Sequence, residues 1–122
     1  MRSWCAFLGL AIAIAPFGNI LANTQKFKSS QANGAIAYHR ASGSYGYAID
    51  RSSARDAKTE ALRQCGHAKC EVVTTFRGAC GAVANGPKRF AAMSGVTRQE
   101  AETKALRKCG DACEVAVWAC TR

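Results

Sequence analysis

The feature that most constrains this chain is an internal repeat. Residues 53–66 (SARDAKTEALRQCG) align without gaps on residues 97–110 (TRQEAETKALRKCG), and seven of these fourteen positions are identical. Shorter matches extend the similarity on both sides, GAIA with GAVA upstream and CEVV with CEVA downstream. Such self-similarity indicates a duplicated supersecondary unit. We therefore expect a single domain, residues 34–122, made of two repeats at 34–80 and 81–120.

Each repeat predicts one helix with defined ends. Ser53 and Thr97 are N-cap residues, and Asp56 and Glu100 follow three positions later, which is the pattern of a capping box. Apolar residues then recur at helical spacing. Both segments end in Cys-Gly, and a glycine at this place accepts the left-handed conformation that terminates a helix.

Strand-like runs flank each predicted helix. A hairpin precedes the first helix, with strands at 35–38 and 45–49 around the loop HRASGS. A second hairpin has strands at 82–84 and 90–93 around an Asn-Gly-Pro turn. The runs EVVTTF and EVAVW follow the helices and are rich in β-branched and aromatic residues. The sequence thus predicts an α+β fold in which a β-β-α-β unit occurs twice and two helices pack on an antiparallel sheet.

The first residues have the layout of a secretory signal peptide. Arg2 precedes an apolar run that reaches Ala15, and a small-residue exit follows at Ala22. The run is too short to span a membrane, so we expect residues 1–22 to be removed and no transmembrane segment to remain. Residues 23–33 are polar and aperiodic, as in a flexible leader. The predicted localisation is therefore periplasmic or extracellular.

Cysteine usage agrees with export. Of seven cysteines, Cys5 lies in the predicted signal peptide, and the remaining six are an even number, as a disulfide framework requires. Several pairings remain open. The repeat favours two short bridges at equivalent helix ends and one bridge between the two halves, namely Cys65 with Cys70, Cys109 with Cys113, and Cys80 with Cys120.

Two other uses of these cysteines fit the spacing less well. Zinc sites pair ligands such as C-x₂-C, whereas the spacings here are C-x₄-C and C-x₃-C with His67 nearby. A thioredoxin-like site places C-x-x-C at the start of a helix, and these cysteines lie at helix ends. We therefore predict no metal ligands and no cofactor.

Candidate catalytic residues are few. His39 lies beside Ser42 and Ser44 in a loop. These residues could form a nucleophile–base pair, but they are also typical of an ordinary polar hairpin turn. His67 occupies a short turn whose counterpart in the second repeat is Asp111. Known hydrolase and phosphate-binding motifs are missing from the sequence. We therefore predict no catalytic residue.

The charge and the tyrosines of the predicted surface say more about function than the catalytic residue types do. Removing residues 1–22 leaves 16 Lys and Arg (17 − 1) against 8 Asp and Glu, a net charge of +8. This charge favours an anionic component of the cell envelope or a protein partner, and it also serves solubility. Tyr45 and Tyr47 share one face of a predicted strand, where they either bind a partner or pack across strands. The candidate partner-binding surface comprises Tyr45, Tyr47, His39, Lys88 and Arg89.

Several motifs resemble one family. The segments GAIAYHRASGSYGYAID, ALRQCG, ALRKCG, FRGACGAVA and VAVWAC are similar to those of the bacterial secreted domain-of-unknown-function family 4189, over about Gly34 to Cys120. The resemblance implies an exported, cysteine-bearing protein without an established general activity. Some relatives resemble secreted proteins of pathogens that act on host cells. The family offers no catalytic motif to carry over.

These observations favour a non-enzymatic, exported binding module, whose narrower form is an inhibitor or immunity-type protein for a secreted enzyme. A secreted effector acting on host cells and a small hydrolase of the cell envelope are the alternatives. Because export separates the protein from the nucleoid, we expect no nucleic-acid partner.

Overall fold

The computed structural model describes residues 32–122. The predicted signal peptide and almost all of the predicted leader lie outside the described residues, although Asn33, assigned to the leader, opens the first strand. The elements follow the expected order and have the following bounds: β1 (Asn33–His39), β2 (Ser44–Arg51), α1 (Ala54–Cys65), β3 (Glu71–Arg77), β4 (Cys80–Asn85), β5 (Phe90–Gly95), α2 (Arg98–Cys109) and β6 (Glu114–Cys120).

The strands form two antiparallel sheets, and the expectation of one sheet was wrong. The first sheet has the order β2-β1-β3 and the second the order β5-β4-β6, so each repeat builds its own sheet. The β-β-α-β unit does occur twice, as predicted. A single sheet fails because the central strands β1 and β4 are buried on both faces. Each therefore needs a second covering layer besides its helix.

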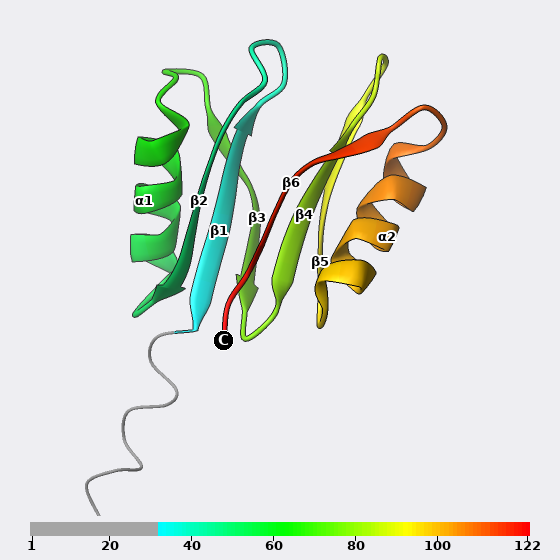
Figure 1. The fold of residues 1–122 in the computed structure, drawn as a ribbon. Coiled ribbons are helices and arrows are strands. Elements are labelled where there is room, and N and C mark those ends of the chain that lie inside the picture. Colours follow the sequence, from blue (N-terminus) through cyan, green and yellow to red (C-terminus); the bar gives the residue numbers. More distant parts are fainter. Residues whose placement is uncertain (1–31) are drawn as a thin grey trace, which may run out of the picture.

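The two sheets pack face to face, and each carries a helix on its outer face (Figure 1). In this four-layer arrangement β1 faces β4, β2 faces β6 and β3 faces β5. The larger apolar side chains meet between the sheets, and the fully buried or nearly buried members of this core are Ile36, Tyr38, Phe76, Val83, Val117 and Ala119.

Small residues line the helix–sheet interfaces. The core under α1 is almost entirely alanine, as is the core under α2. Gly46 of β2 marks the closest approach, because a Cβ atom there would lie 2.3 Å from both the carbonyl oxygen of Ala61 and the backbone nitrogen of Cys65. The small side chains let each helix lie close to its sheet, which keeps the interior densely packed.

Both helices begin at the predicted caps. The side chain of Ser53 accepts a hydrogen bond from the backbone N–H of Asp56, and Thr97 accepts one from Glu100. The return bond of the capping box is displaced by one residue, since the Glu100 carboxylate accepts the N–H of Val96 at 3.3 Å. The helix starts are therefore encoded locally, in four or five residues each. At the other end, Gly66 has the expected left-handed conformation (φ 67°, ψ 12°), whereas Gly110 does not (φ 95°, ψ −159°).

Three disulfides join the cysteines in the pairs that the repeat favours. Cys65–Cys70 and Cys109–Cys113 each tie the end of a helix to the strand that follows it. The third pair, Cys80–Cys120, has a Cα–Cα distance of 4.0 Å. It closes the widest loop, with a sequence separation of 40 residues.

The Cys80–Cys120 bridge does not connect the two halves, contrary to expectation. Cys80 opens β4 and lies directly opposite Cys120 at the end of β6, so both belong to the second sheet. The corresponding pair in the first sheet is Asn33 opposite Arg77. The second unit thus begins at Cys80, and the boundary lies in the turn before it rather than after it.

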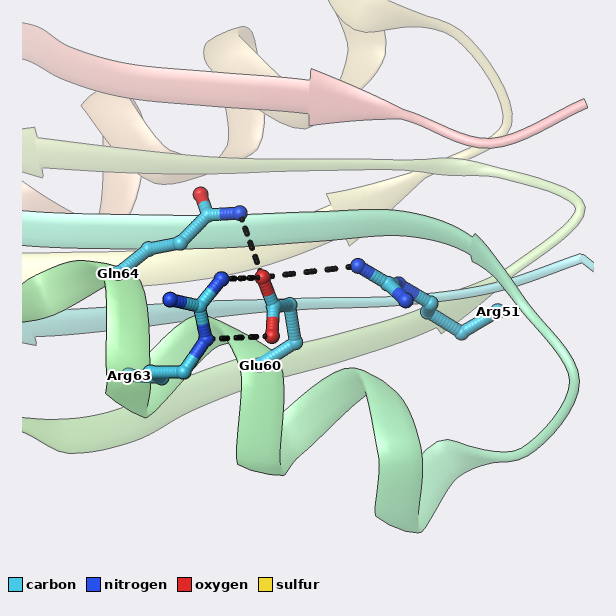
Figure 2. Close-up of polar contacts among 4 residues, drawn as sticks. All are labelled: Arg51, Glu60, Arg63 and Gln64. Carbon is cyan, nitrogen blue, oxygen red and sulfur yellow. Dashed lines mark hydrogen bonds and ion pairs between the residues drawn. The ribbon is translucent and has the colours of Figure 1, made fainter.

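A polar cluster on α1 fixes this helix to the end of β2 (Figure 2). The Glu60 carboxylate accepts hydrogen bonds from Arg63 and from Gln64, and it pairs with Arg51 of β2 at 3.6 Å. The hydrogen bond from Arg63 is the largest cause that lowers the pKa of Glu60, to about 2. The cluster therefore keeps Glu60 ionised well into the acid range.

The loop lengths rank the disulfides by their effect on stability. In the chain-entropy account, removing Cys80–Cys120 costs about 4 kcal/mol and removing a short bridge such as Cys65–Cys70 about 2 kcal/mol. We expect urea denaturation of C80A/C120A and C65A/C70A to show this order. An equal or larger loss in C65A/C70A would contradict it, and peptide mapping without reduction checks the pairs themselves.

The Glu60 cluster predicts a pH-dependent contribution to stability. Because the folded pKa lies below the ordinary value of 4.5, the contribution is complete above about pH 4.5 and is lost as the pH falls toward 2. We expect Glu60→Gln to lower the thermal unfolding midpoint at pH 7 and the difference from the wild type to shrink between pH 4.5 and pH 2. A difference that stays constant with pH would exclude this role.

Candidate functional site

Two regions hold the residues that the sequence singled out: the hairpin tips at one end of the sandwich, and the edge formed by β2 and β6. At the tips, His39 at the end of β1 stacks on His67, with ring centroids 4.1 Å apart and an interplanar angle of 16°. His67 lies in the turn closed by the Cys65–Cys70 bridge. The stacking thus joins the first hairpin to the end of α1.

Ser42 and His39 are close enough for nucleophile–base chemistry, but among the described residues the third residue that such a site needs is not in contact with them. The Oγ atom of Ser42 lies 2.6 Å from Nδ1 of His39, and it also accepts the backbone N–H of Ser44 at 3.2 Å. A triad needs a third group that orients the base. Within residues 32–122 the contacts of the His39 ring are with Ser42 and His67, and neither supplies a carboxylate. The geometry is that of a hydrogen-bonded turn.

His67 is held in one orientation by the backbone. Its Nδ1 accepts the N–H of Lys69 at 3.0 Å, so the neutral ring carries its proton on Nε2. Such a ring presents a donor to the solvent and not a metal-binding lone pair. Among the described residues, His, Cys, Asp and Glu side chains form no group of three or more that could hold a metal ion.

Lys88 and Arg89 lie at the tip of the second hairpin, just before β5. They line a cavity of about 340 Å³ beside the Cys109–Cys113 bridge, together with Asp111. Arg40 of the first hairpin donates a hydrogen bond to the carbonyl of Gly86 at 3.2 Å and so links the two tips. This end of the molecule is basic, but Asp111 offsets part of the charge in the cavity itself.

Tyr38 lies under the two tips. Its ring lies 5.5 Å from that of Phe90 on β5, and the two rings are tilted by 55°. Burial raises the pKa of the Tyr38 phenol, and the nearby Arg40 opposes that effect in part. Tyr38 therefore belongs to the core between the sheets, unlike the other two tyrosines.

The β2–β6 edge carries an exposed apolar surface. Tyr45, Tyr47 and Ile49 alternate along one face of β2 with exposed fractions of 49%, 42% and 37%, and Trp118 of β6 is 41% exposed. Tyr47, Ile49 and Trp118 line one cavity of about 390 Å³ with Ala119 and the last residue of β6. We call the four exposed residues Tyr45, Tyr47, Ile49 and Trp118 the edge surface.

The second copy of the unit lacks most of this surface. Tyr47 lies opposite Ile36 in the first unit, and Ala92 lies opposite the equivalent Val83 in the second. Trp118 lies opposite Ala82, and Thr75 lies opposite the equivalent Ala35. Tyr47 therefore corresponds to Ala92, and Trp118 corresponds to Thr75. The register likewise equates Tyr45 with Phe90, and counting two residues on from Tyr47 and Ala92 equates Ile49 with Ser94, next to the register shift between Asn33 and Ala35. Since the scaffold folds with Ala, Ser and Thr at the equivalent positions, it does not require the large apolar side chains.

Comparison with known proteins agrees with the motifs. The profile of the family described as "Domain of unknown function (DUF4189)" matches residues 33–120. The chain belongs to the DUF4189 family. Rv1269c of Mycobacterium tuberculosis is 38% identical over 87 residues, which are 71% of this chain and 68% of that protein. The predicted family membership is therefore confirmed.

A second relative has a solved structure. Rv1813c of Mycobacterium tuberculosis is 37% identical over 87 residues, which are 71% of this chain and 59% of that protein. Its NMR structure superposes with a TM-score of 0.61 and 34% identity, covering 73% of this chain and 74% of that one. The α+β fold described above is thus shared with this relative.

The structure separates the predicted partner surface into two parts. Tyr45 and Tyr47 lie together on the edge surface, whereas His39, Lys88 and Arg89 lie at the hairpin tips. Sequence reasoning missed Ile49 and Trp118. The signal was present, because aligning the repeats shows Trp118 where the first unit has Thr75.

The described residues also contain no helix long and apolar enough to cross a membrane.

Trp118 gives the edge surface a spectroscopic probe. The Arg98 guanidinium lies 3.8 Å from its ring centroid, and a chain that begins at residue 23 has Trp118 as its one tryptophan. We expect Arg98→Ala to uncover the indole and to increase quenching of its fluorescence by acrylamide. Lys104→Ala, elsewhere on α2, is the control. Equal quenching in all three proteins would show that Arg98 does not cover the ring.

Proposed function

We propose that this protein is an exported, non-enzymatic binding module that recognises a partner protein through the edge surface. The observation that carries the proposal is the asymmetry between the two repeats. Tyr47, Ile49 and Trp118 are exposed at positions where the other copy has Ala92, Ser94 and Thr75. Large side chains that the scaffold does not need, gathered around one cavity, are typical of a binding surface.

The composition of the edge surface favours a protein partner over an anionic polymer. Tyrosine and tryptophan are enriched at protein interfaces, and they dominate binding energy when a partner covers them. Lys88 and Arg89, the two basic residues of the predicted partner-binding surface, line a different cavity at the hairpin tip. The basic charge of the chain then serves to attract an acidic partner and to speed its approach.

Export and rigidity support the same proposal. The signal-peptide pattern and the three disulfides fit a compartment where cysteines oxidise, either the periplasm or the exterior of the cell. One disulfide at the C-terminal end of each helix and one in the second sheet restrict the backbone before any partner binds. A preformed surface loses little entropy on binding, as suits an inhibitor or immunity-type protein for a secreted enzyme.

The test exchanges the edge surface for the residues of the other copy. Affinity capture with the oxidised chain 23–122 is compared with capture by the variant Y47A/I49S/W118T. We expect the wild type to retain a specific protein in stoichiometric amount and the variant to lose it at least tenfold. Circular dichroism establishes that the variant is folded.

Val96→Ser is the matched control, because Val96 is the most exposed of the large apolar residues, at 75%, and lies outside the edge surface. It should capture the same partner as the wild type. The proposal fails if the triple variant retains the partner. It also fails if all three proteins capture anionic polymers alone and release them in salt.

A further inference from the structure

The cavity at the edge surface follows the outer edge of a strand. Trp118, Ala119 and Cys120 are consecutive residues of β6 and all three line it. Side chains of consecutive residues point to opposite faces of a sheet, so a hollow that touches all three lies along the strand's edge. Its remaining walls are Tyr47 and Ile49 of β2, which lies over β6 in the other sheet.

The backbone of β6 has unused hydrogen-bonding groups on this side. Among residues 32–122 the one neighbour of β6 in its sheet is β4. The N–H of Thr121 donates to the carbonyl of Ala79 at 2.8 Å, and bonded and non-bonded pairs alternate along an antiparallel ladder. Trp118 and Cys120 fall on the non-bonded positions. Their N–H and C=O groups therefore point away from β4, toward the groove.

The other edge of the sandwich is closed by a different side chain. At the position of Ala119, β3 has Phe76, whose ring packs against Gly34 and Gly81. A depression also touches the consecutive residues Thr75, Phe76 and Arg77 of β3, but its other lining residues are Asn33, Gly34 and Ala54, so all of them belong to the first unit. The hollow that the facing sheet helps to wall is thus the one at β6.

Resting on the proposed function, we propose that the groove binds an extended peptide segment of the partner protein, which adds to β6 as a further strand. Main-chain hydrogen bonds to Trp118 and Cys120 supply the affinity, and alternate side chains supply the specificity. Side chains on one face of the segment contact Tyr47 and Ile49, and those on the other face contact the Trp118 indole.

The chemistry of the groove defines the segment. The walls are formed mainly by the rings of Tyr47 and Trp118 and by Ile49, so the segment carries apolar side chains at alternate positions. The net charge of +8 calculated for residues 23–122 favours a carboxylate in the segment. The run EVAVWAC also lacks the lysine or proline that protects many edge strands from such pairing. The β6 edge is therefore open to strand addition.

The test uses a synthetic peptide of about nine residues, the length of a long strand. It is selected from a random phage-displayed library on the oxidised chain 23–122, with counter-selection on Y47A/I49S/W118T. Fluorescence of Trp118 measures its affinity. We expect NMR hydrogen exchange to show that the backbone amides of Trp118 and Cys120 become protected when this peptide binds.

Two variants separate the backbone from the side chain at position 118. Trp118→Ala removes the indole alone, whereas Trp118→Pro also removes the outward N–H without breaking a bond to β4. We expect W118P to bind the peptide at least tenfold more weakly than W118A, with affinity measured by calorimetry. Thr75→Pro, at the equivalent place on β3, should bind like the wild type.

Other results would overturn strand addition and are distinct from failure of the proposed function. If W118P and W118A bind equally and the amides stay unprotected, the edge surface binds its partner without pairing to β6. If the library yields no peptide while capture still depends on the edge surface, the partner docks a folded face. If sedimentation shows a dimer that W118P dissociates, the occupant is a second copy of this chain.

Discussion

The structure depends on burying both faces of two central strands. In β1, Ala35 and Ala37 face the helix while Ile36 and Tyr38 face the other sheet. In β4 the same division holds, with alanines toward α2 and Val83 toward β1. The small residues that face the helices let them lie close to the sheets, and the larger residues that face the other sheet hold the two sheets together. Each repeat thus completes its own helix–sheet layer and needs the other repeat to cover its second face.

This division explains what the sequence could predict. The helix positions were predictable because the N-cap, the apolar residues at helical spacing and the terminal glycine lie within one short segment, as the Ser53 and Thr97 caps show. The number of sheets was not, because GAIA and GAVA are apolar throughout and show no alternation of polarity. Such a run fits a strand buried on both faces, but it does not say whether a helix or a second sheet covers each face.

The cysteines show how a favoured pairing can rest on a mistaken reason. If the two repeats close on Cys80 and Cys120 as equivalent residues, the pair becomes a bridge between the halves. The alignment of GAIA with GAVA instead places Cys80 at the start of the second repeat, where the first has Asn33. The contact between His39 and His67 was equally out of reach, since it depends on how a hairpin tip meets a helix end.

The duplication also explains why the two edges of the sandwich differ. The ring of Phe76 lies against both Gly34 and Gly81, where the two central strands meet. Because that space holds one aromatic ring, the equivalent residue on β6 cannot be a second phenylalanine, and it is Ala119. The side of the sandwich with alanine is therefore the less filled one, and the groove between β2 and β6 lies there. Asymmetry that begins in the core thus leaves one edge strand accessible.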